Sequence, residues 1–555
     1  MSKKLTRYWH TLRHLKPVQF YGRLWFKLAK PRLDRTTPPA LRPRPGRWYR
    51  SAGRSSSMSG PGEFVFLGEP GKLTEIGWDG DQREKLWRYN QHYFDDLNAL
   101  QAEDRREWHK ALVVDWVKQN QSSAGNAWEP YPTSLRMVNW IKWALTGNPL
   151  PQVCVHSLAV QARWLMHRLE IHLLGNHLFA NAKALVFAGM FFSGPEAEKW
   201  LSKGFGILAR EVPEQILGDG GHFERTTMYH ALALEDMLDL CNLFGCYGTD
   251  ALSASSRRTV EGWRPVATRM HAWLLAMCHP DGEISLFNDA AIGIAPSCEE
   301  IRAYAQRLGL AVDGPPAGMH GGGVDALWMG QTGYARLTSD NAVALMDIGP
   351  VGPDYLPGHA HADTLSFELS VNGFRVLVNS GTSCYGTGPE RLRQRGTSAH
   401  NTVLINGENS SEVWGGFRVA RRARPVNPQV SADGDTVKVS CGHDGYARLP
   451  GRPFHQRQWQ MRSNQLVILD EVSGPYQTAQ ARYHFSSDVL LSIDEGGTSG
   501  RALLPDGSVV QWVANHGRAH LEKTTWHPRF GASVPNQCLV LEMNKGRSGL
   551  VVSWG

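Results

Sequence analysis

Residues 318–325, GMHGGGVD, divide the chain into two parts whose hydrophobic patterns differ. Before this stretch, segments such as LAVQARWLMHRLEIHLL (158–174) repeat apolar residues at three- and four-residue spacing, which predicts amphipathic helices. After it, short Val, Leu, Ile, Tyr and Trp runs alternate with Asn-Gly, Asp-Gly and Gly-Gly turns, the pattern of an antiparallel β-sandwich. The prediction is a multi-domain α+β protein, with a helical bundle or toroid at 83–320 and a β-sandwich at 321–555.

The first 82 residues have a different character and are predicted to be a basic lead-in, with one amphipathic helix and a Pro-, Arg- and Ser-rich part of irregular structure. This lead-in lacks the continuous apolar core of a secretory signal, and the chain has no run of about 18 apolar residues. We therefore expect a cytoplasmic protein without a membrane span. A periplasmic or secreted protein exported by another route is the alternative.

Composition narrows the class of ligand. The formal charge of +7 is modest for 555 residues and has no basic run behind it, so it suits an anionic ligand but argues against nucleic acid. The 20 tryptophans are numerous, and exposed tryptophan faces commonly hold sugar rings, although many are expected in the core. The eight cysteines are scattered without a CxxC pair, which predicts free thiols rather than a disulfide framework.

The segment GHAHADTLSFELSVNGFRVLVNSGT (358–382) predicts two strands joined at an Asn372-Gly373 turn. Because alternate residues of a strand share a face, His359, His361 and Asp363 would continue the apolar row of the first strand. Two imidazoles at the start of a core face suggest a metal site or a general base. A hydrogen-bonded histidine pair at a sheet edge is the alternative.

Polar or ionisable residues stand beside glycine at element boundaries, where sites are readily built, in four stretches. They are LLGNHLFANAKA (173–184), GDGGHFERTTMYH (218–230), GHAHAD (358–363) and TSCYGTGPERLRQRGTSAHNTV (382–403). Each has a structural alternative. Asn176 could cap a helix, Tyr229 could be a core residue with a bonded hydroxyl, and His400 could be a buried, hydrogen-bonded histidine.

Taken together, the chain resembles the heparinase II/III-like family of polysaccharide lyases. The resemblance rests on Asn-His, a downstream Tyr, His-x-His-x-Asp and Ala-His-Asn-Thr-Val, in that order, and extends from WEPYPTSLRMVNWIKW (128–143) to the last strands. It implies an (α/α) toroid packed on an antiparallel β-sandwich. It also implies β-elimination of an anionic, uronate-containing polysaccharide, such as a glycosaminoglycan, alginate or exopolysaccharide, to 4,5-unsaturated products.

The resemblance also implies roles for individual residues. Asn176, with His177 beside it, would stabilise the uronate carboxylate as the intermediate forms. Tyr229, His359 and Tyr385 would supply the proton acceptor and the proton donor. A tyrosine base needs its pKa lowered by a nearby cation, and the candidates are His222, Arg225 and the Arg391, Arg393 and Arg395 cluster. The residues expected to bind substrate are Trp128, Tyr131, Arg136, Glu224, Arg225 and Arg395.

A metal site is implied as well. In the family, a structural zinc is held at positions that map to His361, Asn379 and His400. The chain departs from the pattern at Asn379, where an Asp is expected, and a neutral amide is a poorer zinc ligand than a carboxylate. The expectation is at most one weakly held divalent metal, and no other cofactor. The site closes only if the chain folds back at GHAHAD or a bulge shifts the register, because a straight strand would separate His361 from Asn379.

Two other functions remain open. A glycoside hydrolase on the same toroid would need a carboxylic acid pair, for which Asp219, Glu224 and Asp289 are the candidates. A non-catalytic polysaccharide-binding or assembly protein of an exopolysaccharide pathway would suit the missing export signal. The set Asn176, Tyr229 and His359 favours the lyase.

Overall fold

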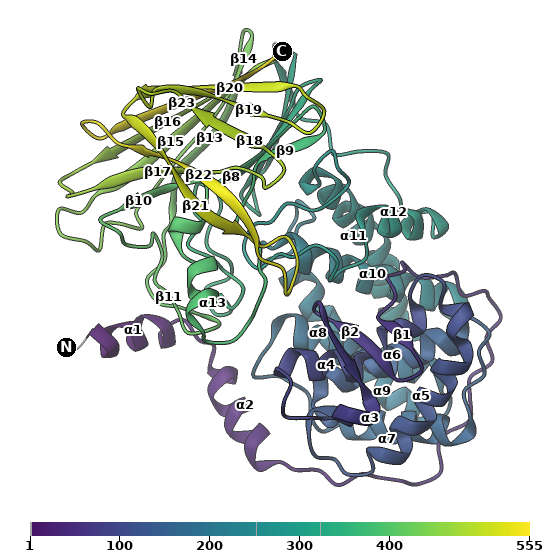
Figure 1. Cartoon of the computed structure of the whole chain (residues 1–555). Coiled ribbons are helices and arrows are strands. Elements are labelled where there is room, and N and C mark those ends of the chain that lie inside the picture. The colour runs from purple at the N-terminus through teal and green to yellow at the C-terminus, as the bar shows by residue number, and fades with distance from the viewer. Residues whose placement is uncertain (1–2, 251, 322) are drawn as a thin grey trace.

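The computed structural model describes residues 3–250, 252–321 and 323–555. A helical half is followed by a β half, which lies on top of it in Figure 1. The change from helix to strand falls between Arg307, the last residue of α12, and Met319, the first residue of β4. Met319 lies within GMHGGGVD, the stretch at which the sequence predicts this change, and Gly322 within it lies outside the described residues.

Nine α-helices and three short 3-10 helices make up the helical half of the described chain. They are α4 (Lys85–Tyr93), η1 (Asp95–Asn98), η2 (Ala102–Arg105), α5 (Arg106–Gln119), η3 (Asn126–Trp128), α6 (Pro130–Leu145), α7 (Gln152–Met166), α8 (Gly175–Phe191), α9 (Pro195–Gln215), α10 (Thr227–Tyr247), α11 (Ala254–Met277) and α12 (Cys298–Arg307). α8 packs against α6, α7, α9 and α10, and this is why it is buried around its whole circumference rather than along one stripe.

Polar residues on α8 are buried with their partners. Lys183 Nζ lies 2.7 Å from carboxylate oxygens of both Asp236 and Asp239, and the Asn181 amide oxygen accepts from the backbone N–H of Glu170 at 2.8 Å.

Most of the tryptophans are core residues too, since 15 of the 20 are buried. The tryptophan count therefore reflects packing in this fold more than a sugar-binding surface.

The lead-in is more ordered than its composition suggests. It contains α1 (Lys3–Leu12), α2 (Pro17–Leu28), β1 (Met58–Gly60), β2 (Glu63–Phe66), β3 (Glu69–Lys72) and α3 (Leu73–Ile76). The three strands form a small antiparallel sheet. Trp48, Met58, Phe64 and Phe66 are buried in the core of the helical half, so this part of the lead-in completes that core.

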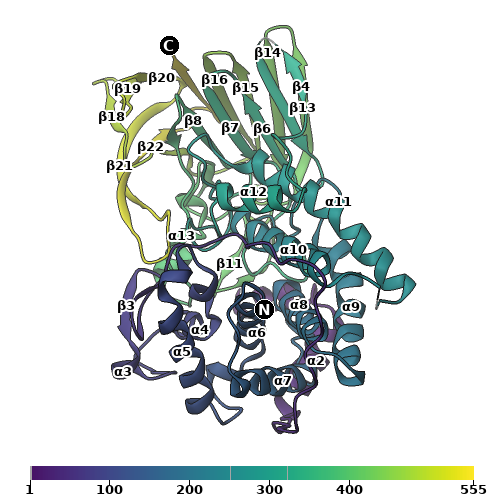
Figure 2. The same ribbon diagram turned by 90° about the vertical axis from the view of Figure 1, so that its right-hand side faces the viewer.

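The β half is built from antiparallel sheets (Figure 2). The six-stranded sheet has the order β4 (Met319–Gly321), β5 (Val324–Met329), β6 (Tyr334–Thr338), β7 (Ala342–Asp347), β8 (Phe367–Val371), β9 (Phe374–Leu377). The eight-stranded sheet has the order β13 (Pro425–Asp433), β14 (Thr436–His443), β15 (Phe454–Arg462), β16 (Gln465–Ser473), β23 (Arg547–Trp554), β20 (Val509–His516), β19 (Ser499–Leu503), β18 (Leu490–Ile493). The four-stranded sheet has the order β10 (Val403–Ile405), β17 (Ala479–His484), β22 (Val534–Glu542), β21 (Arg518–Trp526).

These three sheets share one apolar core. Phe367 of β8 lies with its ring centroid 6.1 Å from that of Trp459 on β15 and 6.2 Å from that of Tyr483 on β17. Figure 1 shows α13 (Pro389–Gln394) and β11 (Val413–Trp414) between the sheets and the helical half. The short helix η4 (Thr397–Ala399) follows α13 in the chain, and β11 pairs with β12 (Arg418–Val419). The predicted architecture, helices followed by an antiparallel β-sandwich, is confirmed.

The hairpin at 367–377 forms as predicted, but the strand begins later. Asn372 and Gly373 both have positive φ, at 52° and 85°, as a tight two-residue turn requires. The prediction that His359, His361 and Asp363 continue the strand is wrong. A turn intervenes, in which Leu365 has φ 64° and the Ser366 N–H donates to the Asp363 carbonyl at 2.8 Å.

Among the described residues, no helix is long and apolar enough to cross a membrane. All eight cysteines are free thiols, as their scattered spacing predicted.

Candidate active site

Three of the predicted catalytic side chains meet where the two halves join. Tyr229 is the third residue of α10, and its ring centroid lies 4.0 Å from that of His359, which comes from the loop before β8. The hydroxyl of Tyr229 is 3.0 Å from the hydroxyl of Tyr385, which lies in the loop before α13. The three side chains are partly exposed, so the cluster is open to solvent on one side.

The buried residue Asp289 links His359 of this cluster to His361 and Arg391. Its buried carboxylate accepts from His359 Nδ1 at 2.9 Å, His361 Nε2 at 2.8 Å and both terminal nitrogens of Arg391. Burial alone would raise the pKa of Asp289, but Arg391, His359 and His361 hold it well below its usual range. An ionised Asp289 keeps the proton of His359 on Nδ1 and leaves Nε2 free to accept a proton.

Both tyrosines of the cluster are protonated at neutral pH. Burial raises the pKa of Tyr229 well above its ordinary value, and Tyr385 adds to the rise. Burial and the Asp289 carboxylate raise the pKa of Tyr385, which Arg391, 5.0 Å over the ring, only partly offsets. The sequence predicts a nearby cation that would lower the pKa of Tyr229 and make it a base. The groups around Tyr229 and Tyr385 instead leave the pKa of both phenols raised. The phenols suit proton donation.

Asn176 and His177 stand at the start of α8. The cap position of this helix is Leu174, with no side-chain cap hydrogen bond, so the alternative of Asn176 as a helix cap is wrong. His177 stacks on Tyr131 with 4.5 Å between ring centroids, and its Nδ1 is 3.2 Å from the Glu170 carboxylate. Burial alone would lower the pKa of His177, but Glu170 raises it above its ordinary value, which favours the imidazolium.

Glu224 connects the two groups. Its side chain is buried, and a β-carbon placed on Gly175 at the start of α8 would lie 3.3 Å from Glu224 Oε1. Burial raises the pKa of Glu224, although His359 and His177 both act to lower it. Its Oε2 has no hydrogen-bond partner among the described residues. Glu224 is thus a buried carboxyl group with a raised pKa, and it lies within electrostatic reach of both His177 of α8 and His359 of the β half.

Four of the residues expected to bind substrate do not join this cluster. Trp128 is buried among Trp116 and Trp164, and Arg136 is buried with its guanidinium 3.8 Å over the ring of Trp116. Arg225 donates to the carbonyls of residues 223, 331 and 332. Arg395 is buried and donates to the carbonyls of residues 360, 415, 416 and 418. These four support the fold around the site, whereas Tyr131 and Glu224 lie beside it.

The carboxylates that a hydrolase would use are not paired. Asp219 accepts from the backbone N–H groups of Gln331 and Thr332 and from the Thr332 hydroxyl, so it ties the two halves together. Asp289 is saturated by His359, His361 and Arg391. From the sequence, Asp289 was a candidate only for the acid of a hydrolase, and its hydrogen bond with His359 was not predicted. No motif around NDA (288–290) marked it, since its partners come from distant segments.

The predicted metal ligands do come together. The turn at residues 363–366 brings the His361 ring to 5.2 Å from that of His400, and His400 Nδ1 is 2.8 Å from Asn379 Oδ1. His361 Nδ1 and His400 Nε2 are buried without partners. Burial lowers the pKa of His361 to about 4 and that of His400 well below its usual range, so both rings are neutral.

This set does not fit a zinc ion well. Two imidazole nitrogens, one each from His361 and His400, are available. The third ligand would be the Asn379 amide, whose oxygen already accepts from His400. Asp289 cannot replace it, because its carboxylate binds the other ring nitrogen of His361. No group of three His, Cys, Asp or Glu that could hold a metal occurs among the described residues. The predicted alternative for His400, a buried and hydrogen-bonded histidine, describes the observed geometry.

Comparison with known proteins agrees with the fold. The family model "Heparinase II/III N-terminus" matches residues 74–306, and "Heparinase II/III-like, C-terminal" matches residues 322–555. The heparin-sulfate lyase of Bacteroides stercoris is 25% identical over 361 residues, 60% of this chain and 52% of its own length. FtsZ-localized protein C of Caulobacter vibrioides is 24% identical over 478 residues, 80% of this chain and 77% of its own length.

Solved structures share the fold. Heparinase III superposes with a TM-score of 0.66 at 18% identity, covering 88% of this chain and 79% of its own. Heparan sulfate lyase HepC from Pedobacter heparinus superposes with a TM-score of 0.57 at 16% identity, covering 97% of this chain and 88% of its own. The chain spans about half the length of the curated lyases that it matches. With both family models matched in order along both halves, the chain belongs to the heparinase II/III-like family.

Proposed function

We propose that the chain is a polysaccharide lyase that cleaves a uronate-containing anionic polysaccharide by β-elimination. The observation that carries this proposal is the position of His359, which is oriented by Asp289 and packs against the protonated phenol of Tyr229. A free imidazole nitrogen beside a phenol provides the proton acceptor and the proton donor that elimination needs. Related lyases from the same family support the reaction class.

The first half of the reaction is removal of the C5 proton of the uronate. His359 Nε2 takes this proton, and the electrons of the C5–H bond move into an enolate-like carboxylate. We assign the amide of Asn176 and the imidazole of His177, whose pKa Glu170 raises, as the donors to that carboxylate, with Glu224 buried beside them. Hydrogen bonds of this kind stabilise the charge that develops as the proton leaves.

The second half is departure of the oxygen on C4. The enolate electrons form the C4–C5 double bond as the C4–O4 bond breaks, and the phenol of Tyr229 gives its proton to O4. Tyr385, whose hydroxyl is 3.0 Å away, can then return a proton to Tyr229. The products are a new non-reducing end with a 4,5-unsaturated uronate and a chain end carrying the freed hydroxyl.

The test is incubation of the purified chain with a panel of uronate polymers: heparan sulfate, chondroitin sulfate, hyaluronan, alginate and a bacterial exopolysaccharide. We expect ultraviolet absorbance of the unsaturated product with at least one polymer. New reducing ends without that chromophore would replace the lyase with a hydrolase.

A second candidate is a non-catalytic polysaccharide-binding or assembly protein. The observation that favours it is the relative matched over most of both lengths, FtsZ-localized protein C, whose name records a location rather than a reaction. Retardation of the chain in gels containing one of the polymers, with neither chromophore nor new ends released, would support this candidate.

A further inference from the structure

The outward face of α2 is apolar, the reverse of what a helix on a protein surface usually shows. The helix lies on the helical half through Gly22 and Phe26, whose ring is 4.5 Å from that of His172, and the Gln19 amide donates to the Tyr355 carbonyl of the β half at 3.2 Å. The side chains on the opposite face are large, apolar and exposed. They are Phe20, Tyr21, Leu24, Trp25 and Leu28.

α1 repeats this arrangement on the β half. Its Thr11 hydroxyl accepts from Trp414 Nε1 at 3.1 Å, which docks one side of the helix beside the β11 and β12 pair. Residues spaced by three and four along the helix form the exposed apolar side, and they are Leu5, Tyr8, Trp9 and Leu12. The two helices lie along one edge of the molecule (Figure 1) and together carry nine large apolar side chains that are exposed, although Tyr8 also packs edge-on against Trp414 at 4.9 Å between ring centroids.

The positive charge of the chain is concentrated on the same segment. Residues 1–35 contain ten Lys and Arg and one Asp, whereas the remaining 520 residues contain 49 Lys and Arg and 51 Asp and Glu. The formal charge of +7 therefore comes entirely from the segment that carries α1 and α2. On α2, Lys16, Arg23 and Lys27 are exposed beside the apolar face.

A basic pocket of about 270 Å³ lies where the end of α1 meets the β half. Asp354 and Glu412 neutralise part of its charge through ion pairs. The arginines that line it are Arg13, Arg421, Arg422, Arg424 and Arg448. A pocket of this charge beside an exposed apolar helix can receive a phosphate headgroup while the apolar side chains enter the acyl region.

We infer that α1 and α2 together form a membrane-surface anchor that binds a bilayer containing anionic lipid. At 12 residues α2 is about 18 Å long, far short of the ~30 Å hydrocarbon core, so the helix lies along the surface. A symmetric dimer through this face would instead set two strongly positive segments against each other. Charge complementarity thus favours anionic lipid over a second copy.

The experiment is flotation of the full chain with vesicles of phosphatidylcholine, with or without phosphatidylglycerol. We expect the chain to float with the anionic vesicles, to remain behind with neutral ones, and to be released as salt is raised. Leu24→Ser/Trp25→Ser should lower the partition coefficient by about tenfold or more. Both residues are more than 60% exposed, so thermal melting should be unchanged.

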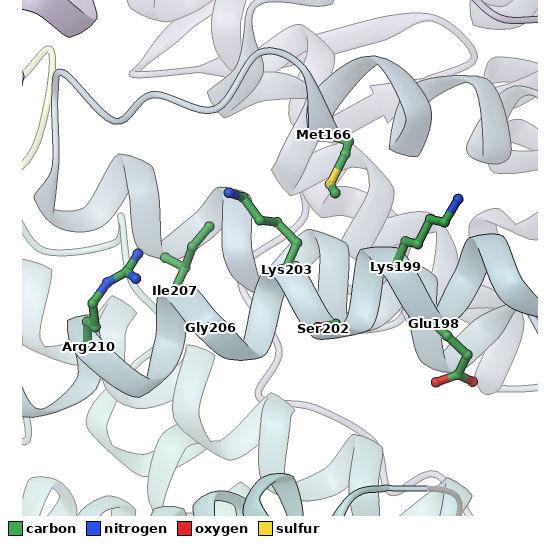
Figure 3. A pocket seen from close by; sticks show the side chains of 8 residues that line it. All are labelled: Met166, Glu198, Lys199, Ser202, Lys203, Gly206, Ile207 and Arg210. Carbon is green, nitrogen blue, oxygen red and sulfur yellow. The ribbon is translucent and has the colours of Figure 1, made fainter.

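Two control variants distinguish a specific effect of α2 from the effect of removing any exposed apolar group or any exposed positive charge. Leu490→Ser/Val513→Ser removes two exposed apolar groups, 71% and 43% exposed, from the β half and should leave flotation unchanged. Arg23→Glu/Lys27→Glu should abolish the preference for anionic vesicles. Its control is Lys199→Glu/Lys203→Glu on α9, where Figure 3 shows both lysines among the side chains that line a pocket.

Three results would overturn the inference. The wild type could fail to float with anionic vesicles, or Leu24→Ser/Trp25→Ser could float as well as wild type. The chain could also be a dimer by light scattering that this variant converts to monomer, with no vesicle binding by either form. The dimer result would mean that the exposed apolar face of α2 binds a second copy of the chain.

Discussion

The rings of His359 and Tyr229 pack against each other with 4.0 Å between centroids and 31° between planes, although one belongs to the β half and the other to α10. The contact exists only because the two halves are packed together, and it places side by side the two groups that the proposed elimination uses as proton acceptor and proton donor. The opposite side of His359 is fixed by Asp289.

Tyr229→Phe tests the proton donor. The change removes the hydroxyl but keeps the ring against His359, so turnover should fall by about 10²-fold or more with little change in apparent substrate affinity. Steady-state kinetics on the best polymer measures this. Tyr476→Phe, a half-buried tyrosine of the β half, is the control and should be silent. Near-normal turnover of a folded Tyr229→Phe would move the proton transfer to Tyr385.

Asp289→Asn tests the orientation of His359. The change leaves Arg391 buried without its carboxylate, so the free energy of unfolding should fall by about 3 kcal/mol or more, and turnover should fall with it. The double variant Asp289→Asn/Arg391→Met removes the unpaired charge and should recover part of the stability in denaturant titrations. Turnover should not recover. If activity returned with stability, Asp289 would be a purely structural residue.

Glu224→Gln gives a pH signature in stability. Because burial raises the folded-state pKa of Glu224 above its ordinary 4.5, the protonated form is favoured by folding. The protonated carboxyl of Glu224 therefore contributes to the free energy of unfolding of the wild type at low pH. This contribution is lost as pH rises from 4.5 through the folded-state pKa, whereas glutamine has no proton to lose. The difference in Tm, variant minus wild type, should grow over that range. A difference independent of pH would mean that Glu224 ionises as easily in the folded chain as in the unfolded one.

Asn379→Asp addresses the metal. Two neutral imidazoles and an amide should hold a divalent ion weakly, so metal analysis of the dialysed wild type should find well under one equivalent. The variant restores a carboxylate facing His400 and should bind zinc close to one equivalent, with a Tm that falls when a chelator is added. One tightly held equivalent in the wild type would show that Asn379 is an adequate ligand here.

Sequence alone was enough for the features that depend on local periodicity. The change from three- and four-residue spacing to alternating runs located the boundary near residue 320, and Asn372-Gly373 specified its hairpin because both positions need positive φ. The family motifs likewise brought out Tyr229, His359 and Tyr385, which the structure brings together.

Tertiary packing decided the rest. Arg136 and Arg395 looked like substrate-binding cations but are buried in the fold, since an isolated arginine in a sequence carries no sign of what will surround it. The strand register that seemed to include His359 ended at the turn of residues 363–366, and that turn sets His361 beside His400. Asp289 became the centre of the site because its three partners come from segments 70 to 102 residues away, a distance over which no sequence period operates.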